Sequence, residues 1–181
     1  VQAEAVLSGE GGHAAFAPAD AAQAELWQWL QQRLGRVQVE HVVSGRGVAR
    51  IYEFLRARAP QAAAAAGAIM AADDPAAEIG RQALQEGDAL SLAVLDLFVS
   101  CYGALAGDHA LTVLARGGVY VTGGIAPRLL PRLAAGGFLA AFNDKGADAP
   151  LTRACPVHVV TNPDLPLLGA ARHAAVTLTP V

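Results

Sequence analysis

The sequence predicts a mixed α/β domain in which helices pack on a small sheet. Its 181 residues match the size of a single domain. Apolar residues make up 54% of the chain and charged residues only 16%, which suits a buried core and excludes a disordered segment. Two glycine-rich turns each follow a valine-containing run, as turns do at the ends of strands. Capped amphipathic segments between them indicate helices.

The charge pattern argues against nucleic acid and membrane partners. The formal net charge is −3, and no run of Lys or Arg is present that would attract phosphates or anionic lipids. The longest apolar stretch, residues 97–107, lies between Asp96 and Asp108 and is shorter than a bilayer span requires. No signal peptide is recognisable, so we expect a cytoplasmic location.

The cysteines and histidines form no metal or disulfide pattern. Cys101 and Cys155 are far apart and are expected to be reduced and buried, as is usual in a cytosolic protein. The five histidines are scattered, without the paired spacing of zinc ligands. We therefore expect no metal ligands among these residues.

Residues 7–13, Leu-Ser-Gly-Glu-Gly-Gly-His, are the most informative stretch of the chain. Each of the three glycines would cost a helix about 1 kcal/mol, so this stretch is expected to be a loop, fed by a strand over residues 1–7. The loop presents Glu10, which accepts hydrogen bonds, and His13, which can donate and accept. Such a pair suits a ligand dense in hydroxyl groups, meaning a sugar. The alternative is a solvated turn with both side chains exposed.

Capping residues place the helices in order along the chain. Asp20 is expected to begin a helix over residues 21–34 that Gly35 ends, and Ser44 one that runs to about residue 58. Asp74-Pro75 begins a helix that runs to about residue 85, after an alanine-rich connection over residues 60–72. A long helix starts at residue 89. The apolar residues expected to face the core in these helices are Leu26, Trp29, Leu30, Leu34, Ile79, Ala83, Leu84, Leu90, Val94, Leu97, Cys101 and Leu105.

Three features within these segments carry further expectations. Trp27 and Trp29 could stack on a base or sugar, but their helical spacing favours packing at the edge of the core. Gly103 and Gly107 weaken the long helix, which predicts that another element packs closely there. Glu40 lies among valines over residues 37–43, and a buried carboxylate needs a partner. The alternatives for Glu40 are a surface position or a salt bridge to Arg46.

Residues 117–127 predict a buried strand followed by a glycine turn into a helix. In such a turn the backbone can approach a nucleotide closely and direct N–H groups toward anions. The stretch lacks the spacing of dinucleotide and Walker motifs, and the alternative is a close-packed β–α turn. A short helix over residues 138–142, a polar loop over residues 143–146, a buried strand over residues 157–160 and a helix from Pro166 are expected to follow.

Four motifs, taken in order, resemble those of bacterial ATP-dependent glucokinases. They are Gly-Glu-Gly-Gly-His at residues 9–13, Glu40 with Val43-Ser44-Gly45, Gly-Gly-Val-Tyr-Val-Thr-Gly-Gly-Ile at residues 117–125, and Pro-Leu-Leu-Gly-Ala at residues 166–170. The Asn-Asp-Lys-Gly loop at residues 143–146 also looks like that of the family. The likeness covers residues 7–173. It implies an actin/hexokinase-like (RNase H-like) sugar kinase that uses ATP and Mg²⁺ to phosphorylate the 6-hydroxyl of glucose, the first step of glycolysis.

The resemblance also implies which residues bind. Glu10, His13 and Glu40 would hold the hydroxyl groups of glucose, and the turn formed by Gly123, Gly124 and Ile125 would lie on the nucleotide side of the cleft. The first phosphate loop of the family, its Asn-Asp-Phe motif with the catalytic Asp, and its second glycine-rich phosphate loop are absent from this chain.

The missing motifs would all precede the chain, which begins with Val rather than Met. We therefore expect residues 1–165 to form the large C-terminal domain of a longer protein. Residues 166–181 would form a helix that packs on the N-terminal domain of the same protein, or that drives homodimerisation when this domain is missing. The chain alone is expected to bind sugar without catalysing its phosphorylation.

Two other functions share some of these features. Kinases of the ROK type also use a Glu-Gly-His sugar loop, but they usually carry a cysteine-rich zinc motif that two isolated cysteines cannot supply. A non-catalytic sugar-sensing domain of a regulator would keep the same three sugar contacts. The Asp expected upstream of the chain would distinguish a sensor from a kinase.

Overall fold

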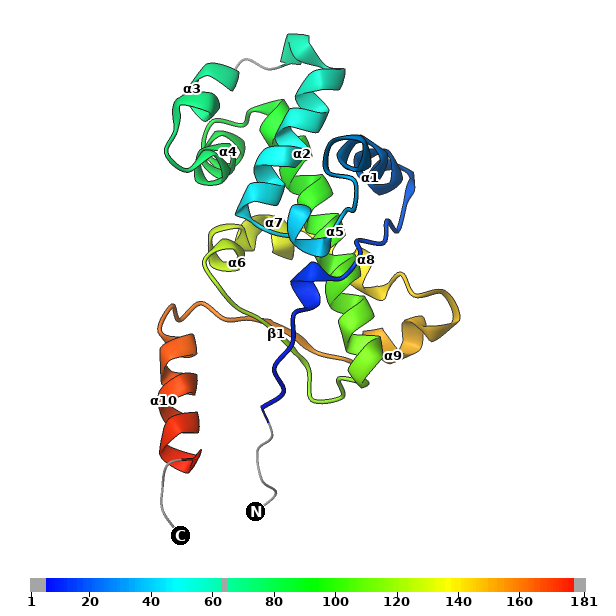
Figure 1. Cartoon of the computed structure of the whole chain (residues 1–181), viewed down its shortest axis with the longest axis vertical. Helices are drawn as coiled ribbons and strands as arrows, with labels where there is room; N and C mark the ends of the chain where they lie inside the picture. Colours follow the sequence, from blue (N-terminus) through cyan, green and yellow to red (C-terminus); the bar gives the residue numbers. More distant parts are fainter. Residues whose placement is uncertain (1–5, 63–64, 178–181) are drawn as a thin grey trace.

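The computed structural model describes residues 6–62 and 65–177, which form a mostly helical body around one long helix, α5 (Figure 1). The helices are α1 (Ala21–Leu34), α2 (Gly45–Arg58), α3 (Ala66–Ala71), α4 (Pro75–Leu84), α5 (Ala89–Val113), α6 (Ile125–Arg128), α7 (Leu130–Ala134), α8 (Gly137–Asn143), α9 (Ala149–Arg153) and α10 (Leu165–Thr177). The strands are β1 (Val119–Val121) and β2 (Val157–Val159), and short 3-10 helices lie at Gly11–His13, Val39–His41, Pro60–Ala62 and Gly146–Asp148.

The helix starts predicted from capping residues are confirmed. Asp20, Ser44 and Asp74 each accept a hydrogen bond from the backbone N–H three residues later, and Asp88 does the same at the start of α5. Each cap satisfies one of the N–H groups that a helix start leaves without a partner. At the end of α1, Gly35 has φ 72°, a left-handed value that favours glycine.

Helix α5 is the centre of the core and packs against α2, α4 and α8. Leu90, Val94 and Cys101 are buried along it as predicted, whereas Leu97 and Leu105 are only partly buried. Burial raises the pKa of the Cys101 thiol to about 12, so this cysteine stays neutral. Cys155 is also free and buried, as predicted.

The apolar stretch at residues 97–107 is shorter than a membrane span, but the helix that contains it is not. Helix α5 continues through Asp96 and Asp108 and has 25 residues. By length and composition it could cross a membrane, but 56% of its most apolar window is buried inside the protein. An apolar helix that is covered on several sides is typical of a protein core. The apolar surface of α5 is therefore used for packing with other helices.

The predicted close approach at the glycines of α5 is confirmed. A Cβ atom at Gly103 would overlap the backbone carbonyl of Phe138 in α8, and one at Gly107 would overlap the carbonyl of Phe142. The side chain of Lys145, which is 8% exposed, passes the same point and binds Asp108 at 2.7 Å and the carbonyl of Ala104 at 3.0 Å. The α5–α8 contact is thus made backbone to backbone.

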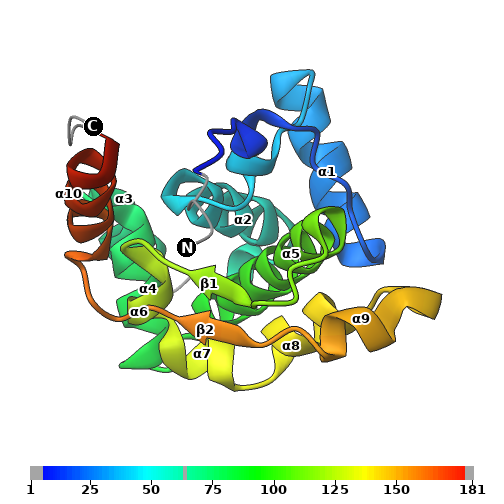
Figure 2. The same cartoon turned by 90° about the horizontal axis from the view of Figure 1, so that it is seen from below.

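The sheet consists of β1 and β2, which pair in parallel with Val119 opposite Val157 and Val121 opposite Val159 (Figure 2). The prediction of buried strands was half wrong. Val121 is buried, but Tyr120 is 61% exposed and stacks on the exposed His158 at 4.9 Å between ring centroids. One face of this sheet lies on the core, and the other faces solvent.

Other predictions fail for local reasons. Leu34 and Leu84 are exposed rather than buried, because each is the last residue of its helix, where the chain leaves the core. The strand predicted over residues 1–7 falls mainly on residues 1–5, outside the described residues, and Val6 and Leu7 form no strand. Trp27 and Trp29 pack at the edge of the core as predicted.

Helix α10 stands apart from the other helices in Figure 1. Its side chains from Leu165 to Ala175 are exposed, including Leu167 at 72% and Leu168 at 56%. An apolar helix face in this state usually marks a contact surface. That it packs on a further domain remains a prediction.

The glycine contact between α5 and α8 leads to a stability prediction. Gly103→Ala is expected to lower the free energy of unfolding by about 1–3 kcal/mol, because the added methyl group forces the two backbones apart. Urea unfolding of the variant and the wild type measures the difference. Gly67→Ala in α3, where a Cβ would meet nothing within 4 Å, is the control and should be neutral or stabilising. Equal losses in both variants would contradict the proposed close contact.

Candidate functional site

The N-terminal loop is joined to the segment after α1 by a short antiparallel bridge between Ala15 and Gln38. The N–H of Phe16 donates to the carbonyl of Val37 at 3.1 Å, and the N–H of Val39 donates to the carbonyl of Ala14 at 3.0 Å. Phe16, Val37 and Val39 are buried beneath this bridge. The bridge therefore holds the 3-10 helix at residues 11–13 beside the one at residues 39–41.

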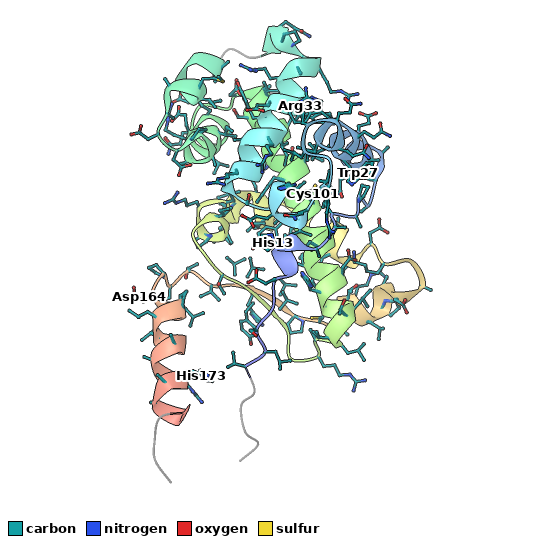
Figure 3. The ribbon with its side chains drawn as sticks, viewed as in Figure 1. His13, Trp27, Arg33, Cys101, Asp164 and His173 are labelled. Atoms are coloured by element: carbon teal, nitrogen blue, oxygen red, sulfur yellow. The ribbon has the colours of Figure 1, made fainter. Side chains whose placement is uncertain are left out.

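The structure brings the three predicted sugar-binding residues together around His13. Its Nε2 lies 3.6 Å from Oε2 of Glu10, and its Nδ1 lies 3.8 Å from Oε2 of Glu40. The side chains of Glu10, His13 and Glu40 are 88%, 56% and 54% exposed. Figure 3 shows His13 on the loop that crosses in front of α5. The three polar groups converge yet remain open to a ligand.

Glu40 is not buried, although it lies among valines. The 3-10 helix at residues 39–41 directs Val39 and Val42 into the core and leaves Glu40 outside. The alternative salt bridge to Arg46 does not form in the described part of the chain. Ser44 fixes the backbone at this point, because its hydroxyl donates to the carbonyl of Glu40 at 2.7 Å and accepts from the N–H of Gly47 at 3.0 Å.

Two glycines, Gly12 and Gly47, lie close to Glu40 and to the turn that follows it. A Cβ at Gly12 would lie 3.9 Å from Oε2 of Glu40, an ordinary contact distance, so the backbone of the loop passes directly beside the carboxylate. A Cβ at Gly47 would overlap the backbone of Val42, so only glycine permits α2 to begin this close to the turn. The Ser-Gly pattern after Glu40 therefore has a local structural cause.

Gln38 and His109 belong to this region and were missed by the sequence analysis. Oε1 of Gln38 lies 3.2 Å from Nδ1 of His13, and the backbone N–H of Gln38 donates to Nδ1 of His41 at 3.1 Å. His109 on α5 lies under the loop, with Cε1 3.5 Å from the position of a Cβ at Gly11. The signal for His109 was its place one helical turn after Leu105.

A cavity of about 380 Å³ connects the two glycine turns. Backbone of Gly11 and Gly12 lines one side, the turn at residues 122–125 lines the other, and His109 lies on the α5 side. Gly123 has φ 101°, which an L-residue rarely adopts. The predicted nucleotide turn and the predicted sugar loop thus face one cavity, although Glu10, His13 and Glu40 do not line it.

A larger cavity of about 620 Å³ is lined mainly by residues of α4 and α6, including Ile125. The apolar part of this cavity is lined by Gly45, Ala77 and Gly80. At its edge, a guanidinium nitrogen of Arg128 lies 3.8 Å from a carboxylate oxygen of Asp74. A mostly apolar cavity with a few polar groups at its rim is typical of a small-molecule site.

Arg81, which lines the larger cavity, is paired with one glutamate of α4 and with one that follows the helix. Arg81 binds both oxygens of Glu78 and one oxygen of Glu86. Hydrogen bonds from Arg81 and Gln82 lower the pKa of Glu78 to about 2. No group of three His, Cys, Asp or Glu side chains that could hold a metal lies within residues 6–62 and 65–177.

Comparison with known proteins gives one consistent result. A family model described as Glucokinase matches residues 1–177. Glucokinases of Trichormus variabilis and Caulobacter vibrioides are 44% and 42% identical to the chain, over 94% and 98% of its length. These alignments cover 54% and 50% of the two relatives, so the chain spans about half the length of the curated relatives it matches.

Solved structures confirm the hexokinase-like fold. A crystal structure of a glucokinase from an Antarctic psychrotroph matches with a TM-score of 0.80 at 34% identity, over 97% of this chain and 52% of that one. A glucokinase from Balamuthia mandrillaris in complex with glucose matches with a TM-score of 0.73 at 21% identity, over 87% of this chain and 44% of that one. The second likeness shows the fold alone.

His41 leads to a prediction of pH dependence. Burial, aided by the charge of Arg50, lowers its pKa below the usual 6.5, and its Nδ1 must stay deprotonated to accept from Gln38. The folded state therefore binds fewer protons than the unfolded state, so stability is full above pH 6.5 and falls as the pH drops below it. Urea midpoints at pH 7.5 and 5.5 should differ less in His41→Gln than in the wild type. An unchanged difference would contradict this role.

Proposed function

This chain belongs to the glucokinase family, and we propose that it supplies the sugar-binding half of a kinase that transfers phosphate from ATP to the 6-hydroxyl of glucose. The observation that carries the proposal is the convergence of three side chains. The two ring nitrogens of His13 lie 3.6 Å from a carboxylate oxygen of Glu10 and 3.8 Å from one of Glu40. These groups come from two segments that the Ala15–Gln38 bridge holds together. The likeness to named glucokinases supports the same activity for the whole protein.

The chemistry of the three groups suits glucose. Carboxylates accept hydrogen bonds, and a neutral imidazole accepts at one nitrogen and donates at the other. Hydrogen bonds between hydroxyls and charged groups contribute about 1.5–3 kcal/mol each. A sugar with several adjacent hydroxyls can satisfy Glu10, His13 and Glu40 together, and a ligand with one hydroxyl cannot.

The nucleotide is proposed to lie along the turn formed by Gly123, Gly124 and Ile125. Ile125 lines both cavities, which supports a nucleotide that lies across this residue with one part in each cavity. The apolar walls of the larger cavity suit a purine base, and its rim at Asp74 and Arg128 suits polar groups. The base and the phosphates of ATP would thus occupy different cavities.

Phosphoryl transfer depends mainly on positioning and on neutralising charge. The residues of this chain hold the sugar and orient its hydroxyl. The described residues form no metal cluster, so we assign no Mg²⁺ ligand here, and Mg²⁺ would be carried mainly by the phosphates, where it neutralises their charge. The chain contains no Asn-Asp-Phe motif, and the catalytic base is proposed to come from an N-terminal domain.

We propose that residues 1–165 form the large domain of a longer cytoplasmic protein and that residues 166–181 pack on its N-terminal domain. The exposed Leu167 and Leu168 of α10 support this arrangement. Without that domain, the same apolar face would favour pairing of two copies. Closure of the two domains would exclude water from the transfer.

Removing one carboxylate tests the sugar site. Glu10→Gln in the intact protein is expected to lower kcat/KM for glucose about 10- to 100-fold, because a charge-assisted hydrogen bond is lost. A coupled assay with Mg-ATP and a panel of hexoses measures this, with Glu53→Gln, an exposed glutamate on α2, as the control. The chain alone should show no turnover. Glucose binding that depends on Glu10 in an intact protein with no turnover would indicate a sugar sensor instead.

Filling the larger cavity tests the nucleotide site. Ala77→Leu adds three carbon atoms at an exposed position that lines this cavity, and it is expected to raise the KM for ATP at least fivefold while changing the KM for glucose less than twofold. Steady-state kinetics of the intact protein measure both constants. Ala21→Leu, exposed at the start of α1, is the matched control. A rise in the KM for glucose alone would place the nucleotide elsewhere.

A further inference from the structure

The imidazole of His13 is surrounded by hydrogen-bond acceptors. Oε1 of Gln38 lies 3.2 Å from Nδ1, with Oε2 of Glu40 at 3.8 Å from the same nitrogen. Oε2 of Glu10 lies 3.6 Å from Nε2. A neutral imidazole carries one N–H, so its proton can satisfy the acceptors on one side only. Which side carries it decides whether Nε2 donates to a ligand or accepts from it.

The surroundings favour the proton on Nδ1. Two oxygens face Nδ1 and one faces Nε2, and the shortest of the three distances is to Gln38. An N–H at Nδ1 would be stabilised by the two oxygens that face it, and Nε2 would then be the nitrogen that accepts a hydrogen bond. Under this arrangement the lone pair of Nε2 lies beside the carboxylate of Glu10.

Gln38 is well placed to fix this state because its own backbone is held on both sides. It pairs with Ala15 in the bridge, and its N–H donates to Nδ1 of His41. Gln38 as a residue is half-buried, whereas Glu10 is exposed. The amide oxygen of Gln38, 3.2 Å from Nδ1 of His13, offers an acceptor without adding a third negative charge to those of Glu10 and Glu40.

We propose that Gln38 is a positioning residue that holds His13 as the Nδ1–H tautomer and so makes Nε2 an acceptor for a sugar hydroxyl. Nε2 and Glu10 then form two neighbouring acceptors 3.6 Å apart, which matches a ligand that donates from two adjacent hydroxyl groups. Gln38 itself does not touch the sugar. The inference rests on the proposed sugar site and adds how that site selects a vicinal diol.

The tautomer can be measured without any activity. Long-range ¹H–¹⁵N correlation spectra of the intact protein labelled at histidine, without sugar, report which ring nitrogen carries the proton, and His13→Gln assigns the signal. The wild type is expected to show the Nδ1–H form of His13. Gln38→Met, which keeps the length of the side chain but removes the acceptor, should lose this preference. An Nε2–H form in the wild type, or an unchanged spectrum in Gln38→Met, would overturn the proposal.

Binding supplies the second part of the test. Gln38→Met should raise the KM for glucose about 3- to 10-fold, the loss of one hydrogen bond, with kcat within twofold, because Gln38 does not contact reacting atoms. Gln38→Glu keeps an acceptor oxygen facing Nδ1 and should retain the proton on that nitrogen, while its added negative charge beside Glu10 and Glu40 is expected to weaken glucose binding. Gln28→Met on α1, an exposed glutamine, is the matched control.

The two parts separate this inference from the proposed function. If the intact protein phosphorylates no sugar but the tautomer depends on Gln38, the kinase activity is refuted and the positioning role stands. If glucose is phosphorylated and Gln38→Met alters neither the tautomer nor the KM, the positioning role is refuted alone. If Gln38→Met does not fold, the proposal is tested by the tautomer of His13 in the wild type and in Gln38→Glu.

Discussion

The site depends on one small interaction, the antiparallel bridge between Ala15 and Gln38. It consists of two backbone hydrogen bonds above buried Phe16 and Val37, and it joins His13 to a side chain 25 residues further along the chain. The two segments are held together by backbone hydrogen bonds and buried apolar side chains, so their polar side chains are not needed for this contact. Glu10, His13 and Glu40 therefore keep free hydrogen-bonding capacity and solvent access, which a binding site for a hydroxyl-rich ligand requires.

Helix α5 provides the second constraint, because it supports both glycine turns. Two glycines bring its backbone against α8, at a cost in helix propensity of about 1 kcal/mol each. The contact is closed by Lys145, a nearly buried ammonium group that is bound to Asp108 and to the carbonyl of Ala104. Burying such a charge is tolerated only when it is paired and hydrogen-bonded. The part of α5 that carries His109 and faces the smaller cavity is therefore fixed in position relative to both turns.

Features set by local chemistry could be predicted from the sequence, and features set by distant contacts could not. The caps at Asp20, Ser44 and Asp74 depend on residues three positions away, so their patterns were sufficient. That Glu10, His13 and Glu40 lie together followed only from the family resemblance, since no spacing rule relates two segments joined by a bridge. The exposure of Glu40 depends on a 3-10 helix that a run of valines conceals. The role proposed for Gln38 depends on His13, which the bridge brings beside it.

Under the proposed function, this arrangement explains how one half of a kinase can be a coherent unit. The acceptors for the sugar and the turn for the nucleotide belong to one packed body, connected through α5 and through the cavity that Gly11, Gly12 and residues 122–125 line. In-line transfer requires the sugar hydroxyl and the terminal phosphate to be aligned to within a fraction of an ångström. With both ligands held on the same body, closure of a second domain can bring the base and the phosphate contacts without moving one ligand relative to the other. This chain would then bind and align the two ligands, and closure of the second domain would start the reaction.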